Sequence, residues 1–210
     1  MTREIFIERI LRQIYNGLPS DDSNITFNLV NQWLNDAIGI AVKNNYKESI
    51  QLDGVAYINN AFYLSFKGLT VTAVGNEGQI YQLTLPQIPI AVGKNEGIAM
   101  LQFVDSTISK TSKTAVPLSM NQVTNVDSMR PIQNKIVYWY EGTTVFVKTS
   151  VMLNRYTANV RMISGGDSTD LTSTLNIPDD YIPTIVEYIK GQIAFEMSRP
   201  IDNTNNGIQN

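Results

Sequence analysis

The hydrophobic residues of this 210-residue chain change their spacing twice, and this change restricts the folds open to it. Up to about residue 47 and again after residue 178, apolar side chains recur three or four positions apart, the spacing of one helical face. Between these segments they alternate with polar residues, as in strands that bury one face. The sequence therefore predicts an α+β fold, a helical bundle with an inserted antiparallel β domain.

Three segments carry the helical spacing, at residues 2–15, 26–44 and 178–198. We expect residues 1–47 to form a helical hairpin and residues 165–199 to complete the bundle. The apolar side chains assigned to the buried helix faces are Ile7, Ile10, Leu11 and Ile14, then Val30, Trp33, Leu34, Ala37, Ile38, Ala41 and Val42, and finally Ile182, Ile185, Val186, Ile189 and Ile193.

Residues 48–164 are predicted to form the β domain. Pairs of alternating segments separated by short turns are typical of β-hairpins. Three such hairpins are expected, at 55–67 with a turn at Asn59–Asn60, at 69–85 with a turn at 75–78, and at 136–148 with a turn at Glu141–Gly142. Further strands are expected at 97–104 and 158–163.

One polar stretch, residues 106–133, interrupts the β pattern and contains no aromatic residue. Because so long a loop is uncommon inside a compact domain, it is expected to be a functional or partner-ordered segment. The alternative is that it contains an unrecognised strand near residues 115–120. The polar tail at 200–210 is expected to be flexible.

The chain contains no Cys and no His. Thiolate nucleophiles, imidazole bases, disulfides and zinc sites with sulfur or nitrogen ligands are therefore excluded. The formal net charge is −3, and the nearest approach to a basic cluster in the sequence is Lys110 with Lys113. Since binding to a phosphate backbone needs clustered cations, a dedicated DNA-binding role is not expected.

The N-terminal segment carries charges at Arg3, Glu4, Glu8 and Arg9 within its apolar pattern, unlike a signal peptide. No apolar run approaches the roughly 18 residues of a membrane span. We therefore expect a soluble protein without a membrane partner.

Two pairs of neighbouring carboxylates, Asp21–Asp22 and Asp179–Asp180, could in principle perform acid–base chemistry or hold Mg²⁺. Each pair directly precedes a predicted helix, where capping explains it more simply. We therefore predict no catalytic, metal-binding or cofactor-binding residue and no cofactor, and we predict that the chain is not an enzyme.

The aromatic run Tyr138–Trp139–Tyr140 faces Phe146 across the last expected hairpin. It is interpreted as a cross-strand aromatic cluster in a sheet core. The alternative is a platform on which a base or a sugar stacks.

Two segments carry a resemblance to a known family: ITFNLVNQWLNDAIGIAVKNNY at 25–46, and LNIPDDYIPTIVEYIKGQIAFEMSRPIDNTNNG at 175–207. Together they resemble the head–tail connector proteins, neck rings or adaptors, of crAss-like podoviruses. The chain is more distantly similar to the gatekeeper-type tail tubular proteins of other podoviruses. The resemblance covers both ends of the chain and leaves the polar stretch at 106–133 unmatched.

This resemblance implies a structural virion protein at the portal vertex, in the neck between capsid and tail, that is assembled in the host cytoplasm. Twelve copies would form a ring under the portal protein, contact the next ring protein of the neck or tail, and extend the channel through which the genomic DNA passes without sequence-specific binding. A polar tail leaving a rigid helix would suit docking to the portal. The residues expected to dock are Arg199, Pro200, Ile201 and Asp202.

Two other functions remain open at this point. One is a different tail or baseplate subunit, in which the β part would dominate. The other is a carbohydrate- or peptide-binding module that uses Tyr138–Tyr140.

Overall fold

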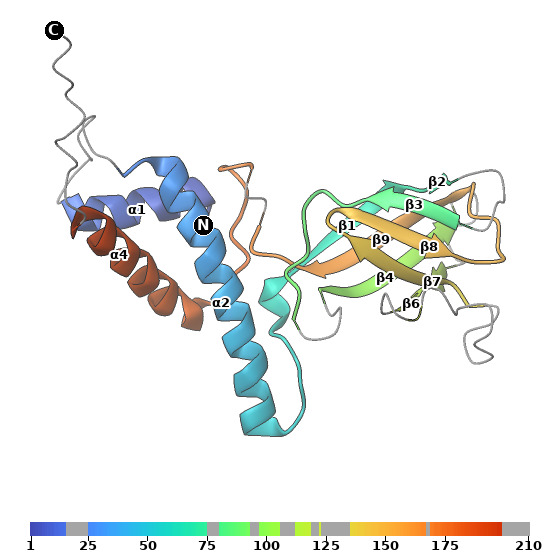
Figure 1. Cartoon of the computed structure of the whole chain (residues 1–210), viewed down its shortest axis with the longest axis horizontal. Helices are drawn as coiled ribbons and strands as arrows, with labels where there is room; N and C mark the ends of the chain where they lie inside the picture. The colour runs from blue at the N-terminus through green and yellow to red at the C-terminus, as the bar shows by residue number, and fades with distance from the viewer. Residues whose placement is uncertain are drawn as a thin grey trace, which may run out of the picture.

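The computed structural model of the chain describes residues 1–15, 25–74, 80–92, 97–105, 112–118, 122, 135–166 and 169–198. Helices occupy both ends of the sequence and the strands lie between them in chain order. In space the helices pack together on one side of the molecule and the strands form two sheets on the other (Figure 1). The helices surround one buried hydrophobic cluster and the sheets enclose a second. The predicted α+β fold is confirmed.

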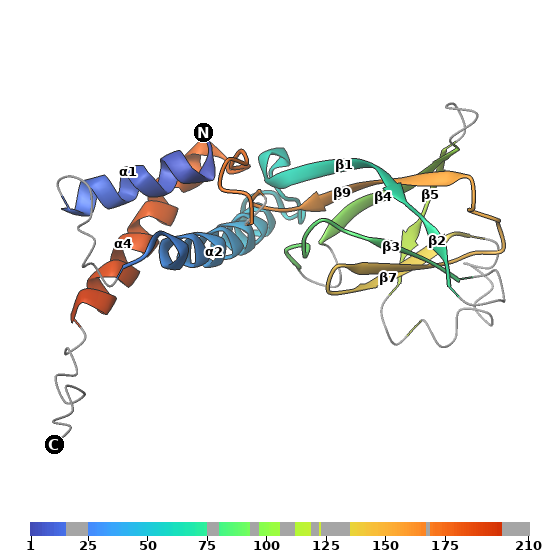
Figure 2. The same ribbon diagram turned by 90° about the horizontal axis from the view of Figure 1, so that it is seen from above.

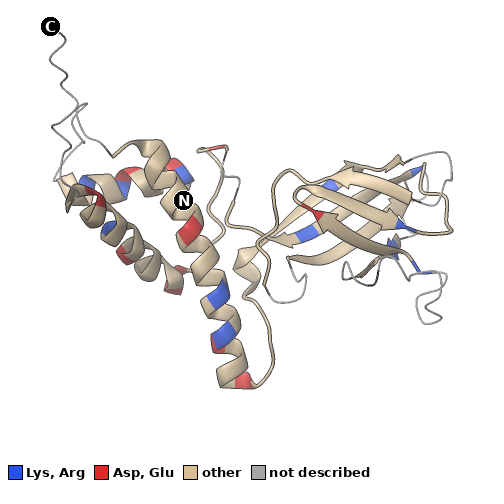
Figure 3. Ribbon diagram, viewed as in Figure 1, with Lys and Arg blue, Asp and Glu red and all other residues tan. Residues whose placement is uncertain are grey.

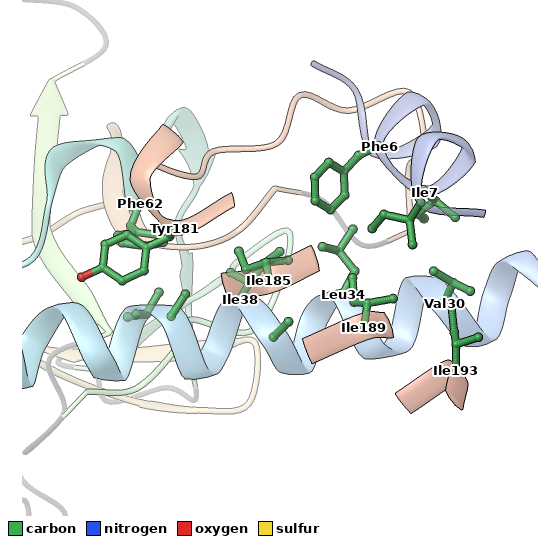
Figure 4. Close-up of a cluster of buried hydrophobic side chains, with 14 of the residues drawn as sticks. Phe6, Ile7, Val30, Leu34, Ile38, Phe62, Tyr181, Ile185, Ile189 and Ile193 are labelled. Atoms are coloured by element: carbon green, nitrogen blue, oxygen red, sulfur yellow. The ribbon is translucent and has the colours of Figure 1, made fainter. Parts of the chain in front are cut away.

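The described α-helices are α1 (Arg3–Tyr15), α2 (Phe27–Asp53) and α4 (Ile182–Ser198), and the 3₁₀ turn η4 (Asp179–Tyr181) leads into α4. Threonines cap the first two: the Ile5 N–H donates to Thr2 Oγ1 at 3.4 Å, and the Leu29 N–H donates to Thr26 Oγ1 at 3.3 Å. Most of the apolar residues assigned to the helix faces are buried against one another (Figure 4). Trp33, Ile14, Ile182 and Val186 pack at the edge of this cluster.

The second helix is longer than the sequence analysis predicted, because α2 continues past Asn44 to Asp53. The boundary expected at residue 47 between helical and β parts is therefore wrong. Gly54 ends the helix in the left-handed conformation, with φ 68°, and its N–H donates to the Ile50 carbonyl at 3.0 Å. Glycine is the usual residue at this capping position, since it adopts positive φ without steric cost.

The described strands form two sheets that pack face to face as a sandwich (Figure 2). One sheet has the strand order β1-β9-β4-β5, and the other has the order β2-β3-β8-β7-β6. The strands are β1 (Tyr63–Thr70), β2 (Thr72–Ala73), β3 (Ile80–Thr84), β4 (Ile98–Asp105), β5 (Ser112–Thr114), β6 (Val116–Pro117), β7 (Val137–Glu141), β8 (Thr144–Lys148) and β9 (Tyr156–Ile163). Pairing is antiparallel except between β6 and β7, which are parallel.

Two of the three predicted hairpin pairings are present. Strand β2 pairs with β3, and β7 pairs with β8 around the Glu141–Gly142 turn. The hairpin predicted at 55–67 is wrong, because β1 pairs with β9, some ninety residues later in the chain. Asn59 begins the 3₁₀ turn η1 (Asn60–Phe62) instead of a hairpin turn, since its Oδ1 accepts the Ala61 N–H at 3.0 Å.

The expectation of a long polar loop is wrong for residues 112–118, where β5 and β6 lie. Ala115 and Leu118 are buried there, and their backbone N–H groups donate to Leu101 O and Tyr138 O at 2.9 and 2.8 Å. The alternative prediction, a strand near residues 115–120, agrees with the position of β6. Apart from Gln122, the rest of the 106–133 stretch lies outside the described residues.

The chain enters and leaves the sandwich at one place, beside the helices. Tyr63 at the start of β1 pairs with Ile163 at the end of β9, and the Ser164 N–H donates to the Phe62 carbonyl at 2.9 Å. Phe62 and Ile163 belong to the buried cluster of the helices. The two cores are therefore connected through a paired crossing of the chain.

A buried arginine joins the helices to this crossing. Arg3 is fully buried, and its guanidinium donates to Asn31 Oδ1 at 3.0 Å, to Asn35 Oδ1, and to the Gly165 carbonyl at 3.3 Å. Gly165 lies so close to α2 that a Cβ there would fall 2.5 Å from Ile38 Cγ2. The contact between α2 and the segment after β9 thus requires glycine.

Replacing Ile189 by Ala should lower the free energy of unfolding by roughly 2–5 kcal/mol, because the side chain is fully buried between α4 and α2. The matched control is Ile5→Ala on the exposed face of α1. This change should alter the free energy of unfolding by less than about 0.5 kcal/mol. Urea denaturation followed by circular dichroism measures both. Equal effects would contradict the helical core.

Replacing Gly165 by Ala should cost about 1–3 kcal/mol through overpacking against Ile38. Ile38→Ala makes room for the new methyl group, so the double variant should lose less stability than the sum of the two single losses. Gly191→Ala is the control, because a Cβ in that position of α4 meets nothing within 4 Å and should stabilise the helix by up to about 1 kcal/mol. Additive losses in the double variant would refute the close contact.

Candidate assembly surfaces

The residues predicted to dock to the portal, Arg199, Pro200, Ile201 and Asp202, lie outside the described residues, which end at Ser198. Their role stays a prediction. The last turns of α4 before them expose two large apolar side chains, Phe195 and Met197, at 59% and 60%.

A more extensive apolar surface lies where α2 ends and the chain turns back toward the sandwich. We call residues 49–58 the α2 tip. In Figure 1 it projects beyond the start of α4. Four of its five large apolar side chains are exposed by between 43% and 83%, Leu52 the most, whereas Ile58 is buried. The four exposed side chains are Ile50, Leu52, Val55 and Tyr57.

Hydrogen bonds from two polar residues of α2 hold the returning chain in place. The buried Ser49 hydroxyl donates to the Tyr57 carbonyl at 2.9 Å and accepts the Tyr57 N–H at 3.1 Å. The Asn59 N–H donates to Asn45 Oδ1 at 2.9 Å. The α2 tip is therefore an ordered structure with four large apolar side chains facing outward, a feature typical of a surface that another molecule covers.

Carboxylates border the α2 tip. The Tyr181 hydroxyl, at the start of α4, donates to Glu48 Oε2 and accepts from Asn45 Nδ2 at 3.2 Å. Burial, the hydrogen bond to Glu48 and the nearby negative charges raise the pKa of Tyr181 to about 12. Asp53, Asp179 and Asp180 are exposed around the same helix ends, and Lys43 and Lys47 are the described cations of this stretch of α2.

Opposite charges are segregated between the two parts of the chain. Residues 63–163, from β1 to β9, contain nine Lys and Arg against five Asp and Glu, a net charge of +4. The remaining residues contain seven Lys and Arg against fourteen Asp and Glu, a net charge of −7. The sequence gives a total of only −3 because these charges cancel.

Lys and Arg residues gather at the end of the sandwich farthest from the helices, which we call the basic end (Figure 3). Lys113 and Arg155 lie beside Tyr156 at the start of β9. Lys148 ends β8 and pairs with Val137, two residues after Lys135. Arg155 forms an ion pair with the buried carboxylate of Asp105, with Nε and Oδ2 2.9 Å apart. These cations lie apart in the sequence, and the fold brings them to one end of the sandwich.

A recess of about 460 Å³ opens at the basic end. Tyr156 lies between two cations there, because Lys113 Nζ and the Arg155 guanidinium carbon are each 5.8 Å from its ring centroid. Met152 at the rim is 78% exposed. The recess therefore combines an apolar wall with positive charge.

The aromatic run divides between the two faces of its sheet. Tyr138 points into the sandwich core, where burial raises its pKa and its hydroxyl donates to the Ile98 carbonyl at 3.2 Å. Trp139 and Phe146 lie on the opposite face, with ring centroids 5.5 Å apart and ring planes 19° apart. The interpretation as a core cluster is therefore wrong for these two residues. Because they stack on each other, they do not form a flat open platform for a sugar.

The structure places one of the two carboxylate pairs at the start of the last helix. Asp179 and Asp180 lie in η4, which leads into α4. Their negative charges favour the start of α4. Asp21 and Asp22 lie outside the described residues.

Within the part of the chain that the structure describes, no three His, Cys, Asp or Glu side chains gather in a way that could hold a metal ion. No described helix combines the length and the hydrophobicity needed to cross a membrane. Comparison with protein-family models and with curated proteins finds no match to this chain.

The raised pKa of Tyr181 predicts a loss of stability in alkali. The folded state holds the phenolic proton more tightly than the unfolded state, whose pKa is 10.0. The stabilisation is therefore complete below pH 10 and is lost as the pH rises toward 12. Unfolding free energies of the wild type and of Tyr181→Phe should converge over this window. A constant difference between them would contradict this linkage.

Proposed function

We propose that this chain is a structural subunit of a tailed-bacteriophage neck, and that its copies assemble into a ring that connects the portal to the tail and extends the DNA channel. The resemblance of residues 25–46 and 175–207 to head–tail connector proteins supplies the biological setting. In this proposal the chain works by assembly and catalyses no reaction.

The α2 tip is the observation that carries the assembly role. Four large apolar side chains held in solvent by an ordered backbone are unfavourable in an isolated molecule and favourable once a partner covers them. The side chains of Ser49 and Asn45 fix the backbone of Tyr57 and Asn59 through hydrogen bonds, which reduces the entropy that binding would otherwise cost. A ring of identical copies supplies such a partner to every subunit, and closes through heterologous contacts.

The partners in this proposal are further copies of the chain, the portal protein and the next ring of the neck or tail. The ring is assembled in the host cytoplasm and becomes part of the virion at the portal vertex. Twelve copies and docking through residues 199–202 follow from the resemblance. The genomic DNA passes through the ring without sequence-specific contacts.

The direct test is the mass and shape of the purified full-length chain over a range of concentrations, by mass photometry and negative-stain electron microscopy. We expect closed rings of one copy number. Leu52→Ser with Val55→Ser should shift the population toward monomers, whereas Ile88→Ser, which removes an apolar side chain 65% exposed elsewhere, should not. A chain that stays monomeric at every concentration, or that assembles equally well without its apolar tip, contradicts the proposal.

A further inference from the structure

We infer that the α2 tip of one copy docks into the recess at the basic end of the next copy's sandwich. This inference rests on the proposed self-assembly and names the two surfaces that meet. In this inference, the molecule that covers the α2 tip is a second copy of this chain.

The chemistry of the two surfaces matches side chain by side chain. The α2 tip presents Leu52 and Val55 with the carboxylate of Asp53 between them in sequence. The recess presents Met152 and Tyr156 as an apolar wall, with the cation Lys113 and the Arg155–Asp105 ion pair beside it. Burying the apolar side chains supplies the attraction, and opposite charges at the rim fix the orientation.

The surroundings of both surfaces have the same complementarity. The carboxylates of Glu48, Asp179 and Asp180 lie near the tip, and Lys43 and Lys47 leave that region with a net negative charge. Residues 63–163 of the sequence carry a net charge of +4, and the residues on either side of this range carry −7. Contacts between like parts of two copies are therefore disfavoured, and contacts of a helical part with a sandwich are favoured.

The two surfaces cannot meet within one molecule. The α2 tip leads back to the crossing beside Phe62, whereas the recess lies at the opposite end of β9. Eight strand residues separate these ends, about 26 Å at 3.3 Å per residue. Because the surfaces differ, the contact between copies is heterologous, and successive copies form a ring where the rotation closes.

The basic end also has the charge to contact a phosphate backbone. Under the proposed function a basic surface lining the channel would hold back the moving DNA, since each neutralised phosphate strengthens binding. The apolar wall of the recess, with Met152 exposed, is a better match to the α2 tip than to a nucleic-acid backbone. DNA is therefore the competing outcome in the test below.

The absence of cysteine allows a clean cross-linking experiment. Leu52→Cys and Met152→Cys, both at highly exposed positions, are made as separate full-length variants and mixed under mild oxidation. We expect a disulfide-linked pair containing one copy of each variant, at least about tenfold more abundant than with Ile88→Cys in place of Leu52→Cys. Equal yields with the control, or a dominant link between two Leu52→Cys copies, would overturn the inference.

Charge reversal is a second test of the docking contact. Lys113→Glu with Lys135→Glu changes the charge of the basic end, counted with Asp105, from +3 to −1. Asp53→Lys with Asp179→Lys changes the charge around the α2 tip from −2 to +2. Each double variant alone should associate at least about tenfold more weakly than the wild type, because like charges then face each other. An equimolar mixture should recover association, since every contact in an alternating assembly again joins opposite charges. Failure of the mixture to recover would overturn the inference.

The outcomes separate this inference from the proposed function. Rings that form without the cross-link between positions 52 and 152 would support the proposed function and contradict the docking contact. A specific cross-link within open filaments would support the docking contact and contradict the proposed ring. Salt-sensitive retention of duplex DNA that Lys113→Glu with Lys135→Glu abolishes, together with no cross-link, would assign the basic end to nucleic acid instead.

Discussion

The structure depends on the crossing where the chain passes between its two cores. Strands β1 and β9 pair there through Tyr63 and Ile163, and the buried guanidinium of Arg3 donates to the carbonyl of Gly165 just beyond. A charged group inside a core is stable only when its hydrogen bonds are satisfied, so this cluster fixes α1, α2 and the end of β9 in one arrangement. The crossing thereby sets where the α2 tip and the basic end lie relative to each other.

Charge and hydrophobicity are divided between these two surfaces in a way that suits a self-assembling subunit. The acidic helical part and the basic sandwich disfavour contacts between like parts, and the apolar tip and recess give the favoured contact its attraction. A charged-residue content of only 17% weakens the repulsion between copies that a higher content would cause. Under the proposed docking, the same chain would remain folded as a monomer and associate in one orientation.

Local patterns predicted the helices, two of the three hairpin pairings and the α+β class, because helical and strand periodicities depend on neighbouring residues. The missed features depend on residues far apart in the chain. The pairing of β1 with β9, the burial of Arg3 and the gathering of Lys113, Lys135, Lys148 and Arg155 at one end have no local signal. The length of α2 does have a local signal in the sequence, because Gly54 is the capping residue that ends the helix. The exposed apolar face of the α2 tip could be recognised only once the helix was seen to extend beyond its bundle.

Hydrogen–deuterium exchange of the assembled protein against the monomeric Leu52→Ser/Val55→Ser variant tests the central claim most directly, because it reports on every backbone amide at once. Docking of the α2 tip into the basic end predicts slower exchange in the assembly at residues 49–58 and at residues 151–156, with little change in the helical core around Ile189. Unchanged exchange at both segments in assembled particles would contradict the docking contact and would place the interface elsewhere on the chain.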